Sequence, residues 1–191
     1  ANYVTALKSV TYASTSDTPT ATSSSRTISW VVDDGAPSLN TSTAVTSTIN
    51  ITAVNDAPTL TSFASVVGTT LEDTQTTISF SDLTAQGNEA DVDGTVTAFE
   101  VQAVSSGTLL IGTSLGAATA FNASTNNTID STHYAYWTPG ANDNGAAVSA
   151  FTVKAKDDTG ATSASAVQVT VGVTAVNDAP TLTSSAPSSI S

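Results

Sequence analysis

The sequence predicts an all-β protein built from tandem antiparallel β-sandwiches. Three observations predict this fold class: apolar residues alternate with polar ones at a period of two, no segment shows a helical period, and one eleven-residue segment occurs twice. Short Thr- and Val-rich segments, separated by Gly, Asn and Asp at intervals of roughly ten residues, are typical of antiparallel sandwiches.

The repeated segment sets the domain organisation. TAVNDAPTLTS occupies residues 52–62 and again residues 174–184. A period near 120 residues suits tandem globular domains joined by the repeated segment as a linker, which Pro58 and Pro180 stiffen. We expect residues 1–57 to be the C-terminal half of a repeat truncated at its start, 58–179 to be a complete repeat, and 180–191 to be a linker and the first strand of a further repeat.

The strands of the complete repeat follow from the period-two pattern. In the last strand, Val167, Val169, Val171 and Val173 point to one face, and Gln168 points to the other. The expected strands are near 59–67, 75–81, 96–104, 107–112, 132–138, 150–156 and 165–175. The first 57 residues match only the last three of these strands, since Ile28, Trp30 and Val32 form one such face and Val45, Ser47, Ile49 and Ile51 form another.

Composition excludes several classes of function. Sixteen acidic residues against four basic ones give a formal charge of −12, which repels nucleic acid and anionic membrane surfaces. The chain has no Cys, so disulfides, thiolate chemistry and a zinc ribbon are excluded. No apolar run approaches the roughly 20 residues that a membrane-spanning helix needs, so we expect no membrane insertion. Nothing at the N-terminus resembles a signal peptide, so an export signal is expected outside this sequence.

The acidic residues fall in the expected loops. Antiparallel strands alternate in direction, so half of the loops meet the incoming linker at the upstream end of the complete repeat and half meet the outgoing linker at its downstream end. The upstream end collects Asn55, Asp56, Asp91, Asp93, Asp157 and Asp158. The downstream end collects Glu72, Asp73, Asn142, Asp143, Asn144, Asn177 and Asp178.

Gathered carboxylates favour a cation. Each pair of neighbouring carboxylates repels by about 1 kcal/mol even in water, unless a cation neutralises it. Carboxylate, amide and main-chain oxygens are the ligands of Ca²⁺. The alternative is turn chemistry, because Asp, Asn and Gly are common in loops for their backbone hydrogen bonds. The convergence of these loops at the joints favours calcium sites.

These motifs resemble a known family. Glu72, the DVD run 91–93, the AKD run 155–157 and the VNDAP run 176–180 resemble the Glu, DxD, AxD and linker motifs of cadherin repeats. With LEDT, DVDG and HYAYWTPGANDNG, the pattern resembles the cadherin-like tandem repeats of large bacterial surface adhesins. The resemblance implies seven-stranded Greek-key, cadherin- and immunoglobulin-like sandwiches, secreted to the cell surface, with Ca²⁺ bound between adjacent repeats of the same chain.

The same resemblance implies a function. It indicates a non-enzymatic calcium-rigidified spacer, or the shaft of an adhesin or fibre, with neighbouring copies in a fibre or biofilm matrix as further partners. The linker reads NDAP rather than DxNDNAP and no DRE motif is present, so fewer ions per joint than in animal cadherins are expected.

Catalytic motifs are weak. The run 112–116 matches G-x-S-x-G, but that motif needs a following helix, and the segment after it is loop-like. Asp91 would begin an EF-hand loop, but its twelfth position is Gln102 rather than Glu. The single His133 is expected in a strand rather than at a metal. We therefore expect no enzyme.

Two other functions remain open. One is a glycan- or partner-binding module, for which Tyr134, Tyr136 and Trp137 would form a stacking platform, although the alternation that sets Trp137 opposite the two tyrosines favours core roles. The segment 113–131 is only moderately long, which favours a spacer. The other is a self-assembling filament subunit, whose incomplete first repeat is completed by strands from a neighbouring chain.

Overall fold

The computed structural model describes residues 3–38 and 41–180. Strands hold 41% of the residues and helices 7%, with the sheets in a sandwich-like arrangement, so the all-β fold class is confirmed. The chain divides into unit 1, Ala1–Asp56 with Asp91–Gly94, and unit 2, Ala57–Ala90 with Thr95–Ser191. The expected first strand of a further repeat, in residues 181–191, lies outside the described residues.

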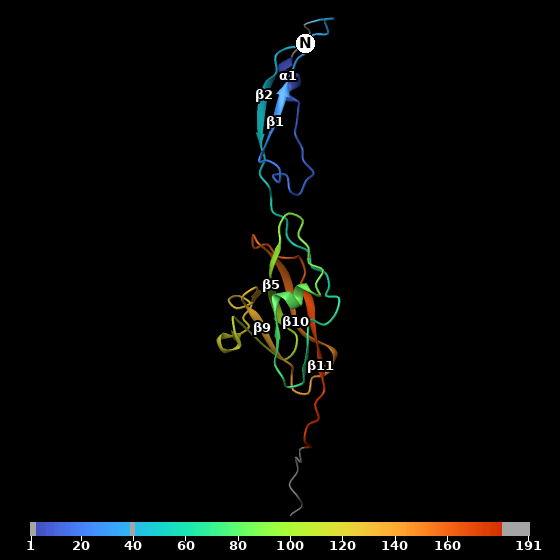
Figure 1. Cartoon of the computed structure of the whole chain (residues 1–191), viewed down its shortest axis with the longest axis vertical. Coiled ribbons are helices and arrows are strands. Elements are labelled where there is room, and N and C mark those ends of the chain that lie inside the picture. Colours follow the sequence, from blue (N-terminus) through green and yellow to red (C-terminus); the bar gives the residue numbers. More distant parts are fainter. Residues whose placement is uncertain (1–2, 39–40, 181–191) are drawn as a thin grey trace, which may run out of the picture. The chain divides into compact units, whose positions relative to one another are not determined.

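Unit 1 is organised around one β-hairpin (Figure 1). Strands β1 (Ser25–Trp30) and β2 (Val45–Asn50) pair antiparallel, with Trp30 opposite Val45. The indole N–H of Trp30 donates to Ser47 Oγ at 2.8 Å across the two strands. A short helix, α1 (Tyr3–Lys8), precedes the hairpin.

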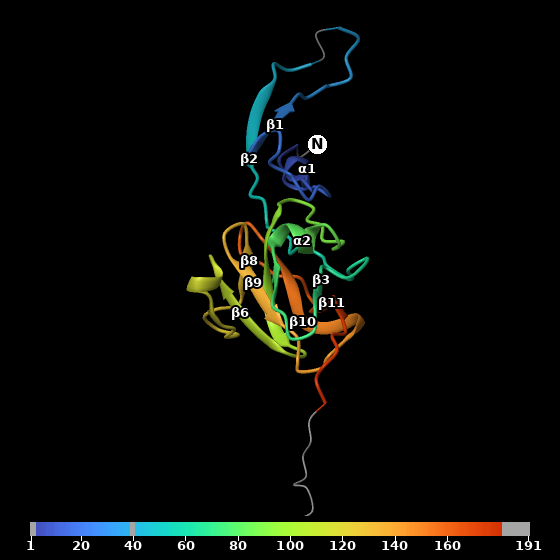
Figure 2. The ribbon, with the colours of Figure 1, turned by 60° about the horizontal axis from the view of Figure 1, so that its bottom comes forward.

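Unit 2 has two sheets, which Figure 2 shows from a second direction. The five-stranded sheet has the order β3-β11-β10-β5-β8 and the four-stranded sheet has the order β4-β9-β6-β7. The strands are β3 (Thr69–Leu71), β4 (Thr76–Ile78), β5 (Val96–Val104), β6 (Thr108–Gly112), β7 (Thr119–Ala120), β8 (Thr128–Asp130), β9 (Tyr134–Thr138), β10 (Gly145–Asp157) and β11 (Val167–Thr174).

The period-two pattern defines the core of unit 2. Phe151, Val153 and Ala155 on β10 and Val169 and Val171 on β11 are fully buried. Alternate residues of a strand face the same side, so these five side chains lie on the inner face of the sheet. The buried indole of Trp137 donates from Nε1 to the carbonyl of Ser106 at 2.8 Å, so the core role expected for this residue is confirmed.

The structure contains short helices that the sequence pattern did not predict. Besides α1, unit 2 contains α2 (Phe80–Thr84) and the 3-10 helix η1 (Leu115–Ala117). A capping box fixes α2, because Asp82 N–H donates to Ser79 Oγ and Ser79 N–H donates to Asp82 Oδ2. Leu83 of α2 is fully buried in the core. Helices of one or two turns are too short to produce a helical period.

The strand expected at 59–67 does not form. Thr59 makes one isolated bridge with Ala90, and the edge strand is instead β3, which pairs parallel with β11. The reason is a contact with a distant residue: Asn88 Oδ1 accepts from the N–H groups of both Thr61 and Ser62, at 2.9 and 3.0 Å, so these groups bond a side chain and not a neighbouring strand.

The segment 113–131 is more ordered than its loop-like sequence predicts. It contains η1, β7 and β8, and β8 extends the five-stranded sheet by pairing with β5. His133 was expected in a strand, but β9 begins at Tyr134 and His133 lies in the preceding turn. In that turn its N–H donates to Asp130 Oδ1 at 2.8 Å.

None of the helices in the described ranges combines the length and the apolar character that crossing a bilayer requires.

Candidate functional site

The downstream end of unit 2 is built around Glu72. This carboxylate is 4% exposed, although charged residues are rarely buried without partners. Val176 N–H donates to its Oε1 at 2.6 Å, and Asn144 Nδ2 donates to its Oε2 at 3.2 Å. One side chain thus connects the turn after β3, the loop before β10 and the outgoing linker.

Sheet register places Glu72 at this point. Leu71 at the end of β3 pairs with Thr174 at the end of β11, and Glu72 N–H donates to the Thr174 carbonyl at 3.0 Å. The next residue, Asp73, has a φ of 58°, so the chain turns sharply after Glu72. The parallel pairing of β3 with β11 therefore brings Glu72 to the start of the linker.

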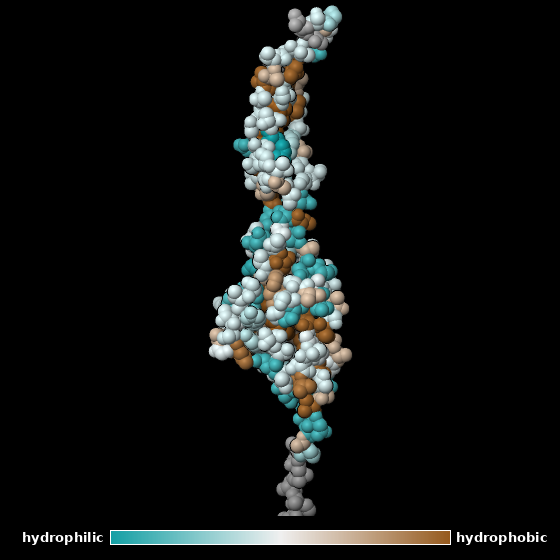
Figure 3. All heavy atoms as spheres, viewed as in Figure 1, coloured by the Kyte–Doolittle hydropathy of each residue, from teal (hydrophilic) through white to brown (hydrophobic). Residues whose placement is uncertain are grey.

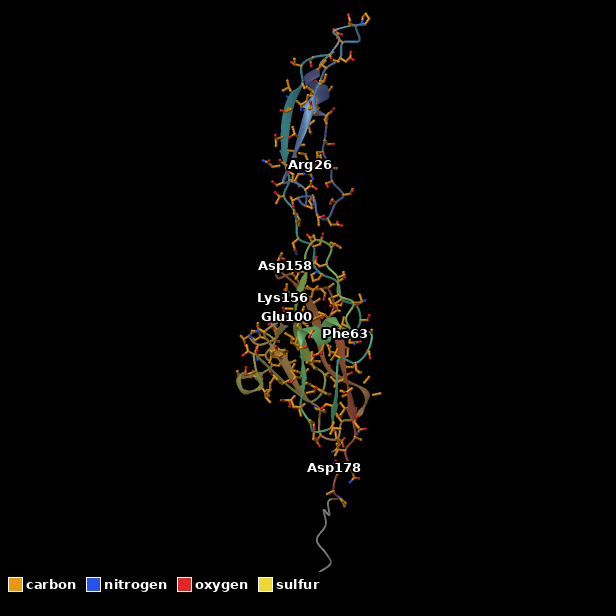
Figure 4. All side chains as sticks on the ribbon, in the orientation of Figure 1. Arg26, Phe63, Glu100, Lys156, Asp158 and Asp178 are labelled. Atoms are coloured by element: carbon orange, nitrogen blue, oxygen red, sulfur yellow. The ribbon has the colours of Figure 1, made fainter. Side chains whose placement is uncertain are left out.

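The other downstream residues are arranged more loosely. Asp143 N–H donates to the Gly140 carbonyl at 2.9 Å, and Asn177 Nδ2 donates to the Asp178 carbonyl at 3.3 Å. Among the described residues, Asp143, Asn177 and Asp178 share no hydrogen bond with Glu72. Asp178 lies in the segment that leaves β11, at the end of unit 2 opposite Asp158 (Figure 4).

Unit 1 contains four of the upstream residues. Asp91 Oδ1 accepts from the N–H groups of Asp93 and Gly94 at 3.2 and 3.0 Å, which closes the turn that holds the two carboxylates. Asp56 N–H lies 3.2 and 3.3 Å from the two carboxylate oxygens of Asp93. Asn55 Nδ2 donates to the Asp56 carbonyl at 2.9 Å, which is the bond that Asn177 makes in the second linker copy.

One oxygen in this group is buried without a partner. Asp91 Oδ2 is inaccessible to solvent and accepts no hydrogen bond from the described residues. A buried carboxylate oxygen without a donor is costly. This atom is the observation in unit 1 that is compatible with a cation.

In unit 2, Asp157 makes hydrogen bonds within its own turn, whereas Asp158 bonds the distant Thr95. Asp157 is 2% exposed, and its Oδ1 accepts from the N–H groups of Thr159, Gly160 and Ala161 at 2.6–3.0 Å. Asp158 Oδ1 accepts from Thr95 N–H at 3.3 Å. The Asp157 carboxylate therefore stabilises the loop after β10, which is the turn chemistry that the sequence left open.

Sequence reasoning missed Glu89. Its Oε2 is buried and has no hydrogen-bond partner among the described residues. The pKa of Glu89 lies above its ordinary value of 4.5. Burial raises this pKa by more than the hydrogen bond from the residue's own backbone N–H lowers it. The signal in the sequence was its place two residues before Asp91, which extends the acidic run to Glu-x-Asp-x-Asp.

A second polar cluster lies beside β8. Asp130 Oδ1 accepts from Thr132 N–H at 2.7 Å and Thr132 Oγ1 at 2.8 Å, and His133 Nδ1 lies 3.1 Å away. Burial raises the pKa of Asp130, but its hydrogen bonds with the backbone and side chains of Thr132 and His133 together outweigh burial and lower the pKa to about 2. These bonds are all local, so the cluster orders the turn before β9.

The tyrosines do not form an open platform. Tyr136 is 7% exposed, and its ring centroid is 6.5 Å from that of the partly buried Tyr134, with the planes tilted by 55°. Sugar stacking needs exposed ring faces, so this geometry does not favour a glycan site at β9.

Both ends carry side chains of the type that binds a hard metal ion. Within residues 3–38 and 41–180, no three His, Cys, Asp or Glu side chains are grouped closely enough to hold one. The side chains at each end offer carboxylate and amide oxygens only, which is the donor set that calcium prefers and zinc does not. The residues therefore fit a hard cation in their chemistry.

No protein-family model matches this chain, and no curated protein matches it.

Proposed function

We propose that this chain is a non-enzymatic segment of an extracellular tandem-repeat shaft, a spacer whose joints are stiffened by calcium. The observation that carries the proposal is the bond between buried Glu72 and the N–H of Val176. A repeat that uses a buried carboxylate to hold its own outgoing linker controls the direction in which the chain leaves, which is the property that a spacer needs.

The pairing of strands supports a Greek-key sandwich of the cadherin and immunoglobulin type. Strands β4, β9 and β6 are neighbours in one sheet, and β11, β10 and β5 are neighbours in the other. In the proposed architecture these neighbours would be the B-E-D and G-F-C groups, with β3 added to the second sheet beside β11.

Calcium is proposed at both ends. Asp56, Asp91 and Asp93 would hold it in unit 1, where the unpartnered Asp91 Oδ2 supports the assignment. Glu72, Asp143, Asn177 and Asp178 would contribute at the downstream end of unit 2. Bound calcium would neutralise the gathered carboxylates and restrict the linker.

Thermal melting of the full chain tests this proposal. Extracellular calcium modules have dissociation constants of about 10⁻⁴ to 10⁻³ M, so about 5 mM calcium would add about 1–2 kcal/mol per site. The melting temperature should rise by several degrees between EDTA and calcium, and small-angle scattering should show a narrower range of conformations with calcium. Identical melting curves in EDTA and calcium would refute the calcium sites.

The second candidate is a self-assembling or partner-binding segment, and the face of the unit 1 hairpin favours it. Leu7, Trp30, Val32 and Val45 line an open apolar cavity of about 520 Å³, and Val45 is 66% exposed. Brown apolar atoms are visible on the surface of this unit (Figure 3). Concentration-dependent sedimentation that is abolished by Val45→Asp would support this candidate, and a monomer at all concentrations would count against it.

A further inference from the structure

The two linker copies show two different contacts. In the second copy, Val176 N–H donates to Glu72, which belongs to the repeat that the linker leaves. In the first copy, Asp56 N–H donates to Asp93, which lies in the loop before β5, in the repeat that the linker reaches. Because the copies are identical over eleven residues, Val176 corresponds to Val54 and Asp56 corresponds to Asp178.

The two contacts do not compete. They use the N–H groups of two linker residues that are two positions apart, and each N–H group donates to its own carboxylate. The N–H of the linker valine can therefore donate to the glutamate of the preceding repeat. The N–H of the aspartate in the same linker remains available to donate to the loop of the following repeat. The first linker copy shows the bond to the following repeat, and the second copy shows the bond to the preceding repeat.

We propose that every linker of this repeat is latched by two main-chain hydrogen bonds, one to a carboxylate of the repeat behind and one to a carboxylate of the repeat ahead. This inference rests on the proposed tandem-repeat function. The partner for Asp178 N–H is then the second Asp of the DVD loop in a following repeat. Charge-assisted hydrogen bonds of this kind are stronger than neutral ones and need no metal.

The two hydrogen bonds of the latch fix the linker to both neighbouring repeats without a metal ion. In the calcium-free state, both carboxylates already bind the linker. The calcium ligands are therefore preorganised, and less conformational entropy is lost when calcium binds. Latching and calcium binding use the same side chains but make different chemical demands. An N–H donor needs one acceptor oxygen, whereas a cation needs the negative charge.

Amide substitutions separate the two roles. Glu72→Gln and Asp93→Asn keep an acceptor oxygen and remove the charge, whereas Glu72→Ala and Asp93→Ala remove both. The matched controls are Asp73→Asn, at the residue after Glu72, and Asp34→Asn, elsewhere in unit 1; each removes one charge. Asn tolerates the positive φ of Asp73, and in Asp34→Asn it keeps the oxygen that accepts from Ala36 N–H at 3.0 Å.

The experiment is amide hydrogen exchange, followed by NMR on the full chain in EDTA. Val176 and Asp56 amides should exchange at least about tenfold more slowly than the same amides in an unfolded peptide. Each alanine variant should remove the protection of its own linker amide, and the amide variants and the controls should keep it. Protection of Val171, in the core strand β11, reports whether a variant still folds.

Two results would overturn the latch: wild-type Val176 and Asp56 amides that exchange at the unfolded rate, or alanine variants that fold and keep full protection. Neither result depends on calcium. The proposed calcium sites fail instead if calcium leaves the melting temperature unchanged. If Glu72→Gln retains the protected Val176 amide in EDTA and loses calcium-induced stabilisation, both proposals are supported together.

Discussion

Glu72 and Val176 are 104 positions apart in sequence, yet the N–H of Val176 lies 2.6 Å from Glu72 Oε1. Closing so long a segment is entropically unfavourable, and the pairing of β3 with β11 supplies the closure. The carboxylate is 4% exposed and therefore largely removed from competition with water. The turn after β3 and the segment that follows β11 are thus fixed to each other.

Neutralising the DVD loop should weaken calcium binding. In the double variant Asp91→Asn with Asp93→Asn, the turn hydrogen bonds keep their acceptors while two anionic ligands are lost, so calcium affinity should fall about tenfold or more. Isothermal titration on the full chain measures this. The control is Asp33→Asn with Asp34→Asn, in which Asn also keeps the Asx bonds to Gly35 and Ala36. Equal weakening by both pairs would contradict the assignment.

Removing the charge of Glu89 should stabilise the calcium-free protein at neutral pH. Burial raises the folded-state pKa of Glu89 above 4.5, so the native state holds this proton more tightly than the unfolded state does. The wild type therefore loses stability, relative to Glu89→Gln, as the pH rises through the raised pKa. Melting temperatures in EDTA should converge below about pH 4 and favour the variant at pH 7. A wild type more stable at pH 7 would contradict the prediction.

The contribution of Asp130 to folding stability should depend on pH in the opposite direction to that of Glu89. The folded pKa of Asp130 is lowered from 3.8 to about 2, so its contribution to stability is present above 3.8 and is lost as the pH falls through about 2. Asp130→Ala should cost about 1 kcal/mol at pH 7, since the carboxylate is partly exposed and screened. The difference in melting temperature should shrink from pH 4 to pH 2. A difference that stays constant from pH 4 to pH 2 would contradict the prediction.

The two tryptophans should respond very differently to truncation. Trp137 is fully buried and its Nε1 bonds the Ser106 carbonyl, so Trp137→Phe leaves a cavity and an unpaired acceptor, at about 2–4 kcal/mol. Trp30 is only partly buried and bonds an exposed hydroxyl of Ser47, so Trp30→Phe should cost less than about 1 kcal/mol. Urea unfolding followed by far-ultraviolet circular dichroism measures both. Similar costs would mean that unit 1 is packed as tightly as unit 2.

Strands whose inner face is a run of large apolar residues were predictable. The predicted strand 96–104 matches β5 in both bounds, and Val169 and Val171 are buried as their alternation requires. The strand predicted at 59–67 does not form, because Asn88 Oδ1 accepts from the N–H groups of residues 61 and 62. Asn88 lies 26 or 27 positions away in sequence, so a local pattern does not reveal this contact. The short helix α2 was missed because its signal is a two-residue capping box and not a periodic pattern.

The all-β class, the duplicated eleven-residue segment and the loops that hold the acidic residues were readable from the sequence alone. These features follow from local periodicity and identity, which require no knowledge of distant contacts. The identity of the carboxylates that bind main-chain N–H groups depended on tertiary contacts. The Asp157 carboxylate accepts hydrogen bonds from its own loop, and the Glu72 carboxylate accepts one from Val176 N–H, 104 positions away. Asp91 Oδ2 has no hydrogen-bond partner among the described residues. The reason is physical: strand register sets which donors approach a carboxylate, and the donor in the Glu72 contact is a main-chain N–H, which no side-chain motif reveals.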